Sequence, residues 1–229
     1  MKIIARIFND YKEKFGIPRQ AGLAEGLYSK IVFEGEYRNP EALRGIEEYS
    51  HLWLIWEFSE AKREQFSPTV RPPRLGGNKR VGVFATRSPF RPNPIGLSSV
   101  RLVEVKKTAD EGVVLIVEGA DLMSGTPIYD VKPYITYTDS HPEATQSFAE
   151  EGLLHKLEVE IPEDLKAIIP KDKLCGLIAL LSEDPRPAYI DDPKRGYTMT
   201  FGELEISFLV ADKVLTVTDI VKSKIKILT

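Results

Sequence analysis

The sequence contains little of what metal- and thiol-dependent proteins use. Among its 229 residues there is one cysteine, Cys175, and there are three histidines, which are scattered along the chain. One thiol forms neither an intrachain disulfide nor a cysteine-rich zinc site, and the histidines lack the close spacing of a metal-binding helix. The apolar neighbours of Cys175 in KDKLCGLIALL favour a buried packing residue over a nucleophile. We therefore expect no bound metal and no thiol chemistry.

Long hydrophobic runs are also missing. No apolar stretch approaches the roughly 18–20 residues that a membrane-spanning helix needs. The first residues hold a short apolar patch that Arg6, Asn9 and Asp10 interrupt, which is too little for the apolar region of a signal peptide. Apolar residues make up 42% and charged residues 28% of the chain, the balance of an ordinary globular protein. The sequence thus predicts a cytoplasmic protein with no membrane partner.

The common phosphate-binding and nucleophile motifs are absent from the sequence. The stretch GNKRVGV begins like a P-loop, but Val83 and Phe84 stand where lysine and serine or threonine are needed. No G-x-G-x-x-G follows a strand and opens a helix, so no helix N-terminus is aimed at a pyrophosphate. No G-x-S-x-G and no kinase signature is found. A Rossmann-type methyltransferase or dehydrogenase is therefore disfavoured.

Several short segments predict strands, because they are rich in Val, Ile, Leu and aromatic residues and are bounded by turn formers. They are 2–8, 28–34, 51–58, 80–86, 97–105 and 113–119. Since no regular helices separate them, they favour an antiparallel barrel or sandwich over a doubly wound sheet. The run HLWLIWEF is apolar on both faces, so we expect it deep in the barrel wall. Asn39 as N-cap and Pro40 at the first helical position predict one short helix.

The composition changes near residue 140. Two helical patterns separated by Pro170 precede a proline-rich loop, and YTMTFGELEISFLV and KVLTVTDIV then predict returning strands. We therefore expect a mainly β chain with two domains. These are an N-terminal antiparallel β-barrel domain over 1–139 and a smaller C-terminal α+β domain over 140–229.

The net charge of −3 hides an uneven distribution. Between Arg71 and Lys107 there are nine basic residues and one acid, Glu104, so this window carries +8 and the remainder carries −11. A local basic field on an acidic protein indicates an anion-binding surface. The alternative is a set of solvated loop residues.

The stretch GVFATRSPFRPNPIG, residues 82–96, displays two arginines on a backbone that three prolines restrict. Proline fixes its own φ and pushes the preceding residue into extended geometry, so side chains on this loop are presented in nearly constant positions. Arginine gains from such presentation because its planar fork binds carboxylate or phosphate through two hydrogen bonds. The alternative is a rigid crossover whose arginines, Arg87 and Arg91, pair with nearby acids.

Further proline-stiffened polar loops recur along the chain. GIPRQAG places Arg19 and Gln20 directly after a proline, and EDPRPAY places Arg186 between two prolines. In DLMSGTPIYDVKPY, a Gly-Thr-Pro turn leads to three residues at alternating strand positions on one face, namely Asp130, Lys132 and Tyr134. Polar loops at strand ends are typical walls of one binding site.

These motifs resemble a known family. IPRQAG, SHLWLIWEF, RPPRLGGNKRVGVFATRSPFRPNPIGLS, GTPIYDVKPY and DPRPAY together are similar to the TrmO family, also called TsaA or YaeB, in register from about residue 3 to 200. The resemblance implies S-adenosylmethionine-dependent methylation of tRNA, at N6 of threonylcarbamoyladenosine 37 beside the anticodon. It also implies a β-barrel domain with a small C-terminal domain, and a homodimer.

Carried over residue by residue, the resemblance implies two groups of site residues. The S-adenosylmethionine contacts would be Arg19, Gln20, His51, Leu52, Arg87, Leu97, Asp121, Leu122, Met123, Ser124, Gly125 and Thr126. The tRNA contacts would include Arg186 and Tyr189, where arginine meets phosphate and an aromatic ring stacks on an unpaired base. His51 has an alternative role as a capping or core histidine, and Tyr189 one in packing.

Methyl transfer from a sulfonium is an in-line displacement, so alignment supplies much of the acceleration. The carbamoylated N6 is a poor nucleophile until its proton is lost, and Asp130 or Asp121 is a candidate base. The substrate's own carboxylate is the alternative to an enzyme base. We expect Arg91, Lys132 or another basic residue to hold that threonyl carboxylate, and Tyr134 to contact the substrate or tRNA. A non-catalytic module that binds S-adenosylmethionine or RNA, and a small-molecule methyltransferase, stay open as alternatives.

Overall fold

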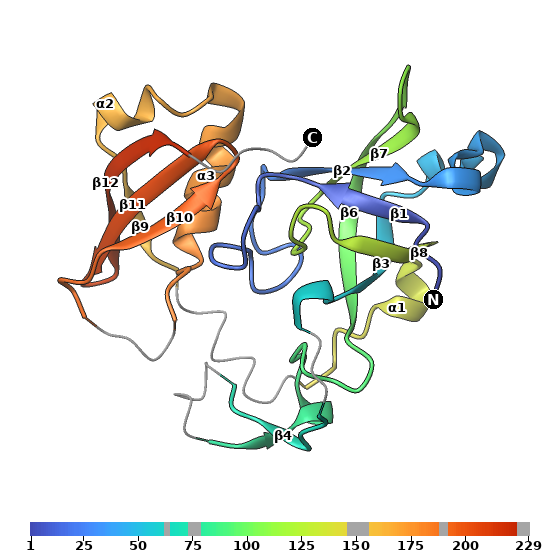
Figure 1. Ribbon diagram of the computed structural model, residues 1–229, viewed down its shortest axis with the longest axis horizontal. Helices are drawn as coiled ribbons and strands as arrows, with labels where there is room; N and C mark the ends of the chain where they lie inside the picture. Colours follow the sequence, from blue (N-terminus) through green and yellow to red (C-terminus); the bar gives the residue numbers. More distant parts are fainter. Residues whose placement is uncertain (62–64, 73–78, 146–155, 188–191, 224–229) are drawn as a thin grey trace.

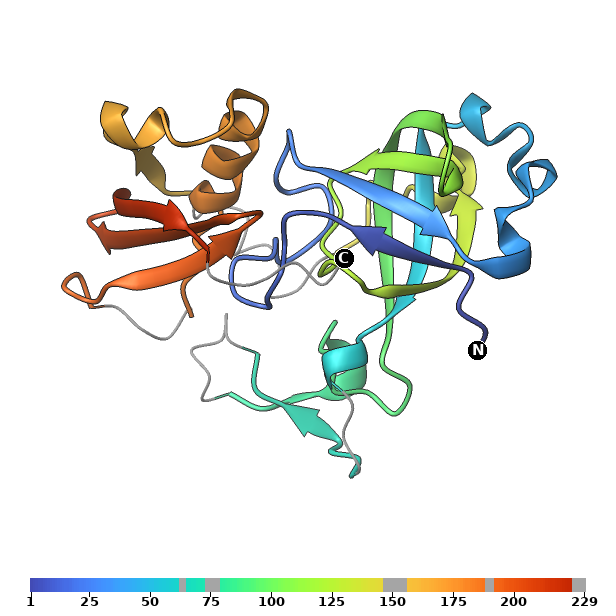
Figure 2. The same ribbon diagram turned by 45° about the horizontal axis from the view of Figure 1, so that its top comes forward.

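A computed structural model of the chain describes residues 1–61, 65–72, 79–145, 156–187 and 192–223. Two sheets lie side by side, an N-terminal one and a C-terminal one, and a small hairpin lies below them in two views (Figures 1 and 2). Within the described residues no helix has both the length and the apolar character to cross a membrane.

The N-terminal sheet is a ring of six strands, and every pair in it is antiparallel. The strand order β1-β2-β7-β6-β3-β8 closes on itself, as in a barrel. The strands are β1 (Ala5–Phe8), β2 (Tyr28–Phe33), β3 (His51–Glu57), β6 (Ile95–Thr108), β7 (Gly112–Glu118) and β8 (Pro127–Pro133). This agrees with the prediction of a mainly β chain.

Strand β3 alternates between the two faces of the ring rather than being buried on both. Leu52, Leu54 and Trp56 are 0%, 0% and 5% exposed and point into the ring. Trp53 faces outward, where its ring lies 5.5 Å from that of Tyr134 and its Nε1 donates a 2.7 Å hydrogen bond to Asp139 in α1 (Thr136–Asp139). The inner face of this strand is therefore deeply buried, as expected. The outer face is only half-buried, and Trp53 there is covered by Tyr134 and α1.

The predicted strand 80–86 is wrong over most of its length. Only β5 (Val81–Gly82) is extended, pairing with β4 (Thr69–Val70), and the chain then turns into the 3-10 helix η6 (Val83–Ala85). Val83 is 1% exposed and donates its backbone N–H to Pro68. Burial of that one side chain, followed by the proline-rich loop, ends the strand early.

The segment between β2 and β3 is a series of 3-10 turns. They are η1 (Gly35–Arg38), η2 (Pro40–Leu43) and η3 (Ile46–Glu48), and η4 (Ser59–Ala61) follows β3. The predicted N-cap is confirmed, because the side chain of Asn39 accepts a 3.0 Å hydrogen bond from the backbone N–H of Glu41. The helix that it caps is a short 3-10 helix.

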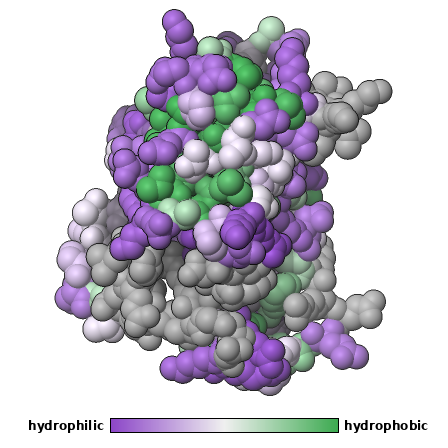
Figure 3. All heavy atoms as spheres, turned by 90° about the vertical axis from the view of Figure 1, so that its left-hand side faces the viewer, coloured by the Kyte–Doolittle hydropathy of each residue, from purple (hydrophilic) through white to green (hydrophobic). Residues whose placement is uncertain are grey.

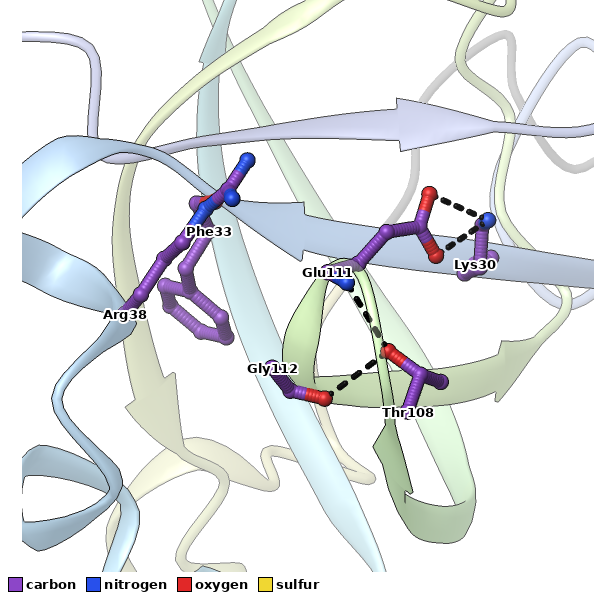
Figure 4. Close-up of polar contacts among 6 residues, drawn as sticks. All are labelled: Lys30, Phe33, Arg38, Thr108, Glu111 and Gly112. Atoms are coloured by element: carbon purple, nitrogen blue, oxygen red, sulfur yellow. Dashed lines mark hydrogen bonds and ion pairs between the residues drawn. The ribbon is translucent and has the colours of Figure 1, made fainter.

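The turn between β6 and β7 is fixed by side chains (Figure 4). Thr108 Oγ1 donates to the carbonyl of Gly112 at 3.0 Å and accepts from the backbone N–H of Glu111 at 3.2 Å. Lys30 in β2 pairs with the Glu111 carboxylate at 2.6 Å. The turn is thereby held against the neighbouring strand.

The C-terminal sheet has the order β10-β11-β12-β9, in which β9 is parallel to β12 and the other pairs are antiparallel. Its elements are β9 (Glu158–Glu160), α2 (Glu163–Lys166), α3 (Lys171–Ser182), β10 (Tyr197–Phe201), β11 (Leu204–Ala211) and β12 (Val214–Lys222). Figure 3 views this side of the molecule, where hydrophilic side chains surround smaller apolar areas.

Cys175 is exposed, so the expectation of a buried cysteine is wrong. Helix α3 buries Gly176, Leu177, Leu180 and Leu181, and Cys175 lies off that stripe. Apolar neighbours in sequence are therefore not neighbours in space on a helix.

The hydrophobic core of the C-terminal sheet is completed by N-terminal residues. Tyr11, Ala24 and Leu27, from the segment between β1 and β2, belong to this core. At the contact, a Cβ on Gly176 would come within 2.6 Å of the Gly26 carbonyl oxygen. The segment 11–27 thus ties the C-terminal sheet to the ring.

Gly96 provides a test of the packing at the start of β6. A Cβ at this position would overlap the indole ring of Trp56. We predict that Gly96→Ala lowers the free energy of unfolding by about 1–3 kcal/mol, the usual cost of overpacking. Denaturant unfolding measures it, and Gly82→Ala is the control, since its Cβ would meet nothing within 4 Å. Equal stability of both variants would contradict the packing described.

Candidate functional site

A cavity of about 730 Å³ opens at the edge of the ring where β3 ends and β6 begins. Its walls come from the segment 17–21, the proline-rich loop 86–91, the first residues of β6 and the turn after β7. Of the expected site residues, it brings together Arg19, Gln20, Arg87, Arg91, Leu97, Asp121, Met123 and Thr126.

Asp121 supplies a largely buried carboxylate to this cavity. Its Oδ1 accepts a 2.5 Å hydrogen bond from Ser98 Oγ, and Ser98 Oγ accepts a 2.9 Å hydrogen bond from Trp56 Nε1. Burial raises the pKa of Asp121 above its usual range, while the Ser98 hydrogen bond and the positive charge of Arg87 act in the opposite direction. The carboxylate is therefore fixed in place with little solvation.

Arg87 also lines the cavity and is linked to the segment 17–21. Its Nη1 donates to Gln20 Oε1, and Gln20 Nε2 donates to the carbonyl of Arg19 at 2.5 Å. The guanidinium is exposed enough to meet a ligand anion. A cation and a buried anion thus face one cavity.

Arg19 ties this wall to the C-terminal part of the chain. Its Nη2 donates 2.9 Å hydrogen bonds to the backbone carbonyls of Asp184 and Arg186. The segment that follows α3 is therefore clamped beside the cavity.

Arg91 lines the cavity and also braces its own loop. Its Nη1 donates to the carbonyls of Thr86 at 2.8 Å and Val83 at 3.2 Å, and its guanidinium lies 5.5 Å from the centre of the Phe84 ring. The proline-rich loop is thus stiffened by hydrogen bonds as well as by proline geometry.

Five expected contacts of the methyl donor are not part of the cavity lining, and four of them, all except His51, support the ring. Leu52 and Leu122 are 0% exposed and lie in the core of the ring. Ser124 Oγ accepts from the backbone N–H of Asn9 at 3.3 Å. The Gly125 carbonyl accepts from Arg6 Nη1 at 3.0 Å, and Gly125 has φ +86°, a conformation that favours glycine.

The residues expected on one face of β8 lie on the outside of the ring and are not part of the cavity lining. Asp130 forms a 2.9 Å ion pair with Lys132. Tyr134 packs beside His51, at 6.2 Å between ring centres, and His51 Nδ1 is hydrogen-bonded to Ser50 Oγ at 2.9 Å. His51 is thus the first residue of β3, and its ring is held by Ser50 and Tyr134 at that end of the strand.

Arg186 is paired within its own loop. Its Nε and Nη2 donate to the two carboxylate oxygens of Asp184 at 2.8 and 2.9 Å. Tyr189, the other expected tRNA contact in this motif, lies outside the described residues.

The sequence reasoning missed the residues that hold Asp121, namely Ser98 and Trp56. Ser98 is 2% exposed and points into the ring between Gly96 and Val100. A serine at an inward position of an otherwise apolar strand needs a partner, and this was the signal available in LSSV.

The cavity lining suits a ligand that carries a cationic group, a carboxylate and an apolar part. Asp121 suits a cationic group, Arg87 suits a carboxylate, and Leu97 and Met123 supply apolar surface. Among the residues that the structure describes, no group of three His, Cys, Asp or Glu side chains is placed to hold a metal ion.

The raised pKa of Asp121 leads to a prediction about the stability of the protein. Because burial raises the pKa of Asp121 in the folded protein, its contribution to stability is present in acid and is lost as pH rises through that pKa. Asp121→Asn keeps an oxygen acceptor for Ser98 and removes the charge. We therefore expect the variant to have a higher Tm than the parent at neutral pH, with the difference shrinking toward pH 4. Thermal unfolding from pH 4 to 8 measures it, and a parent more stable than the variant at neutral pH would contradict the assignment.

Comparison with known proteins identifies relatives along nearly the whole chain. The family model of the tRNA-methyltransferase O N-terminal domain matches residues 6–140, and that of the TrmO C-terminal domain matches residues 154–223. Of the curated proteins, a tRNA (adenine(37)-N6)-methyltransferase of Escherichia coli is 39% identical over 91% of this chain and 92% of its own length. A protein of Pseudomonas aeruginosa named a putative S-adenosylmethionine-dependent methyltransferase, RcsF, is 37% identical over 89% of both chains.

The fold agrees with these matches. Two crystal structures of TrmO from Pseudomonas aeruginosa superpose with TM-scores of 0.76 and 0.73, each at 30% identity and over 96% of this chain, covering 95% and 97% of theirs. The motifs, the fold and the two family models all point to the same group of proteins. This chain belongs to the TrmO family.

Proposed function

We propose that this protein transfers a methyl group from S-adenosylmethionine to N6 of adenine 37 in tRNA. The family supports the reaction, and relatives that it matches over most of their length carry the name tRNA (adenine(37)-N6)-methyltransferase. The observation that carries the proposal is one cavity in which a buried carboxylate faces an arginine.

The residues of the cavity fit S-adenosylmethionine. In this proposal Asp121 binds the positively charged end of the donor, and Arg87 binds its carboxylate through a planar fork. Leu97, which is 58% exposed, and Met123 offer apolar surface for the adenine ring. Gln20 holds the Arg87 side chain in position by a hydrogen bond, and the Arg19 carbonyl holds Gln20 in turn.

The donor supplies the reactive methyl group, and the protein supplies position and charge. The cavity wall fixes the direction from which the substrate nitrogen approaches, because a displacement requires alignment. Of the two candidate bases, Asp121 lies in the cavity and Asp130 lies on the outer face of the ring in an ion pair. Because Asp121 is engaged by the donor in this proposal, the N6 proton passes to the substrate's own carboxylate, the alternative to an enzyme base.

The nature of the substrate nucleoside belongs to the proposal. We propose threonylcarbamoyladenosine as the target, since a carboxylate on the substrate would complement the basic window around the cavity. Arg91 lies in the cavity and is the cation available to such a group. Lys132 lies outside it and is paired with Asp130.

We propose that residues 1–139 carry the donor site and that residues 140–229 contribute to tRNA contact. The clamp from Arg19 to the backbone of Asp184 and Arg186 supports a shared tRNA surface. A cytoplasmic homodimer is part of the same proposal, and the exposed apolar side chain of Phe84, 69% exposed, supports the subunit contact.

The test is methyl transfer by the purified protein. The protein is incubated with isotopically labelled S-adenosylmethionine and tRNA carrying threonylcarbamoyladenosine, and the nucleosides are separated by mass spectrometry. We expect label on the N6-methylated nucleoside and none after ribonuclease treatment of the tRNA. Binding of donor and tRNA without transfer would support a non-catalytic module instead.

Arg87 gives a sharper prediction. Arg87→Ala removes a charge-assisted contact to the donor carboxylate, which is worth about 1.5–3 kcal/mol, so we expect donor affinity to fall by roughly 10- to 100-fold. Isothermal calorimetry with S-adenosylmethionine measures it. Arg44→Ala is the control, because Arg44 is exposed and pairs with Glu41 far along the chain from the cavity walls. An unchanged affinity in Arg87→Ala would exclude this residue from the donor site.

A further inference from the structure

A second cavity of about 840 Å³ lies beside the first. It is bounded by the segment 14–20, the β4–β5 hairpin, the loop 86–90, Leu180 at the end of α3 and the segment 183–187 that follows α3. Arg19, Gln20 and Arg87 line both cavities, so the two are adjacent. Whatever occupies the second cavity therefore lies next to the proposed site of methyl transfer.

The hairpin contributes two arginines to this second cavity. Arg71 follows β4 and Arg80 precedes β5, and the last paired residues, Val70 and Val81, are opposite each other. The two arginines thus flank the same end of a two-stranded ladder. Both side chains are exposed.

Neither hairpin arginine forms an ion pair with a carboxylate of the residues that the structure describes. Arg80 Nη1 donates a 2.8 Å hydrogen bond to Thr69 Oγ1, which orients the side chain and neutralises no charge. Like charges that face each other across a short ladder repel and destabilise it. Stability of the hairpin therefore does not explain this pair, whereas an anion between the arginines would.

Arg186, which lines the second cavity from the segment after α3, does form an ion pair. Its side chain is 13% exposed and binds both carboxylate oxygens of Asp184. Arg19 is likewise engaged with the backbone of that segment. The cations of this wall therefore hold the wall together, whereas Arg71 and Arg80 on the hairpin are exposed and form no ion pair within the described residues.

We propose that the β4–β5 hairpin, through Arg71 and Arg80, binds phosphates of the tRNA strand beside the nucleotide that is methylated. The inference rests on the proposed function. Arginine forks suit phosphate oxygens, and phosphate contacts fix the register of a nucleic acid without reading its sequence. The lower edge of the molecule, which carries the hairpin, is largely hydrophilic in Figure 3. The hairpin positions the strand, and the first cavity receives the base.

The salt dependence of tRNA binding tests this inference. Each phosphate contact contributes about 0.7–0.9 to the slope of log affinity against log salt. We expect the double variant Arg71→Gln/Arg80→Gln to lower that slope by about 1.5 and to weaken tRNA binding roughly tenfold at moderate salt. Its affinity for S-adenosylmethionine stays at the parent value.

The matched control is Lys106→Gln/Lys107→Gln, which removes the same charge. These exposed lysines precede the β6–β7 turn, at the other end of the molecule from the hairpin in Figures 1 and 2. We expect this variant to keep the parent slope. Equal losses in both variants, or an unchanged slope in the hairpin variant, would overturn the inference.

Two further measurements show whether a loss of tRNA binding comes from misfolding, from a lost dimer or from the hairpin itself. Thermal unfolding confirms that each variant folds, and light scattering reports its oligomeric state. If the hairpin variant loses a dimer that the parent forms, the hairpin is a subunit contact and the inference is wrong. If the parent methylates no tRNA, the proposed function fails, whereas normal methylation with an unaltered slope in the variant rejects the hairpin alone.

Discussion

The site depends on a carboxylate that the protein largely shields from water. Asp121 follows β7 at the edge of the ring, and burial there disfavours its charged form. The hydrogen bonds from Trp56 to Ser98 and from Ser98 to Asp121 hold it, and the charge of Arg87 acts on it across the cavity lining that they share. Strands β3 and β6 must pair in their observed register for these groups to meet. The ring is therefore the frame that positions one charge.

The loops at this edge receive their shape from contacts far apart in the sequence. Arg19 clamps the segment after α3, and Gln20 is bonded to Arg87 in the proline-rich loop. Residues of the segment 11–27 also complete the core of the C-terminal sheet. A displacement of that sheet would thus reach the donor cavity through a continuous set of contacts. This arrangement links the surface proposed to meet tRNA with the site proposed to hold the methyl donor.

Much of the ring could be predicted from the sequence because alternating apolar residues and turn formers are local signals. The strands near residues 28, 51, 97 and 113 and the Asn39 cap follow from such signals. The structure of the segment 80–86 could not be predicted in this way, because the burial of Val83 ends its strand early. The burial of Cys175 was mispredicted because a run of apolar neighbours does not say which face of a helix packs.

The same limit applies to the site. The motifs indicated Arg87, Leu97 and Asp121, which line one cavity, and also Asp130 and Lys132, which pair on the outer face of the ring. Strand alternation places Asp130 and Lys132 on one face, and closure of the ring decides which face is turned away. Ser98 and Trp56 were missed because their role is a contact across strands.

The central claim is that the charged Asp121 carboxylate binds the cationic methyl donor, and the pH dependence of donor affinity tests it most directly. Calorimetry would titrate S-adenosylmethionine into the parent and into Asp121→Asn from pH 4 to 8. Because the pKa of Asp121 is raised, the parent should lose affinity as pH falls, beginning above the usual range of an aspartate. The variant should bind weakly and evenly across that range. Identical pH profiles for the two proteins would contradict the account.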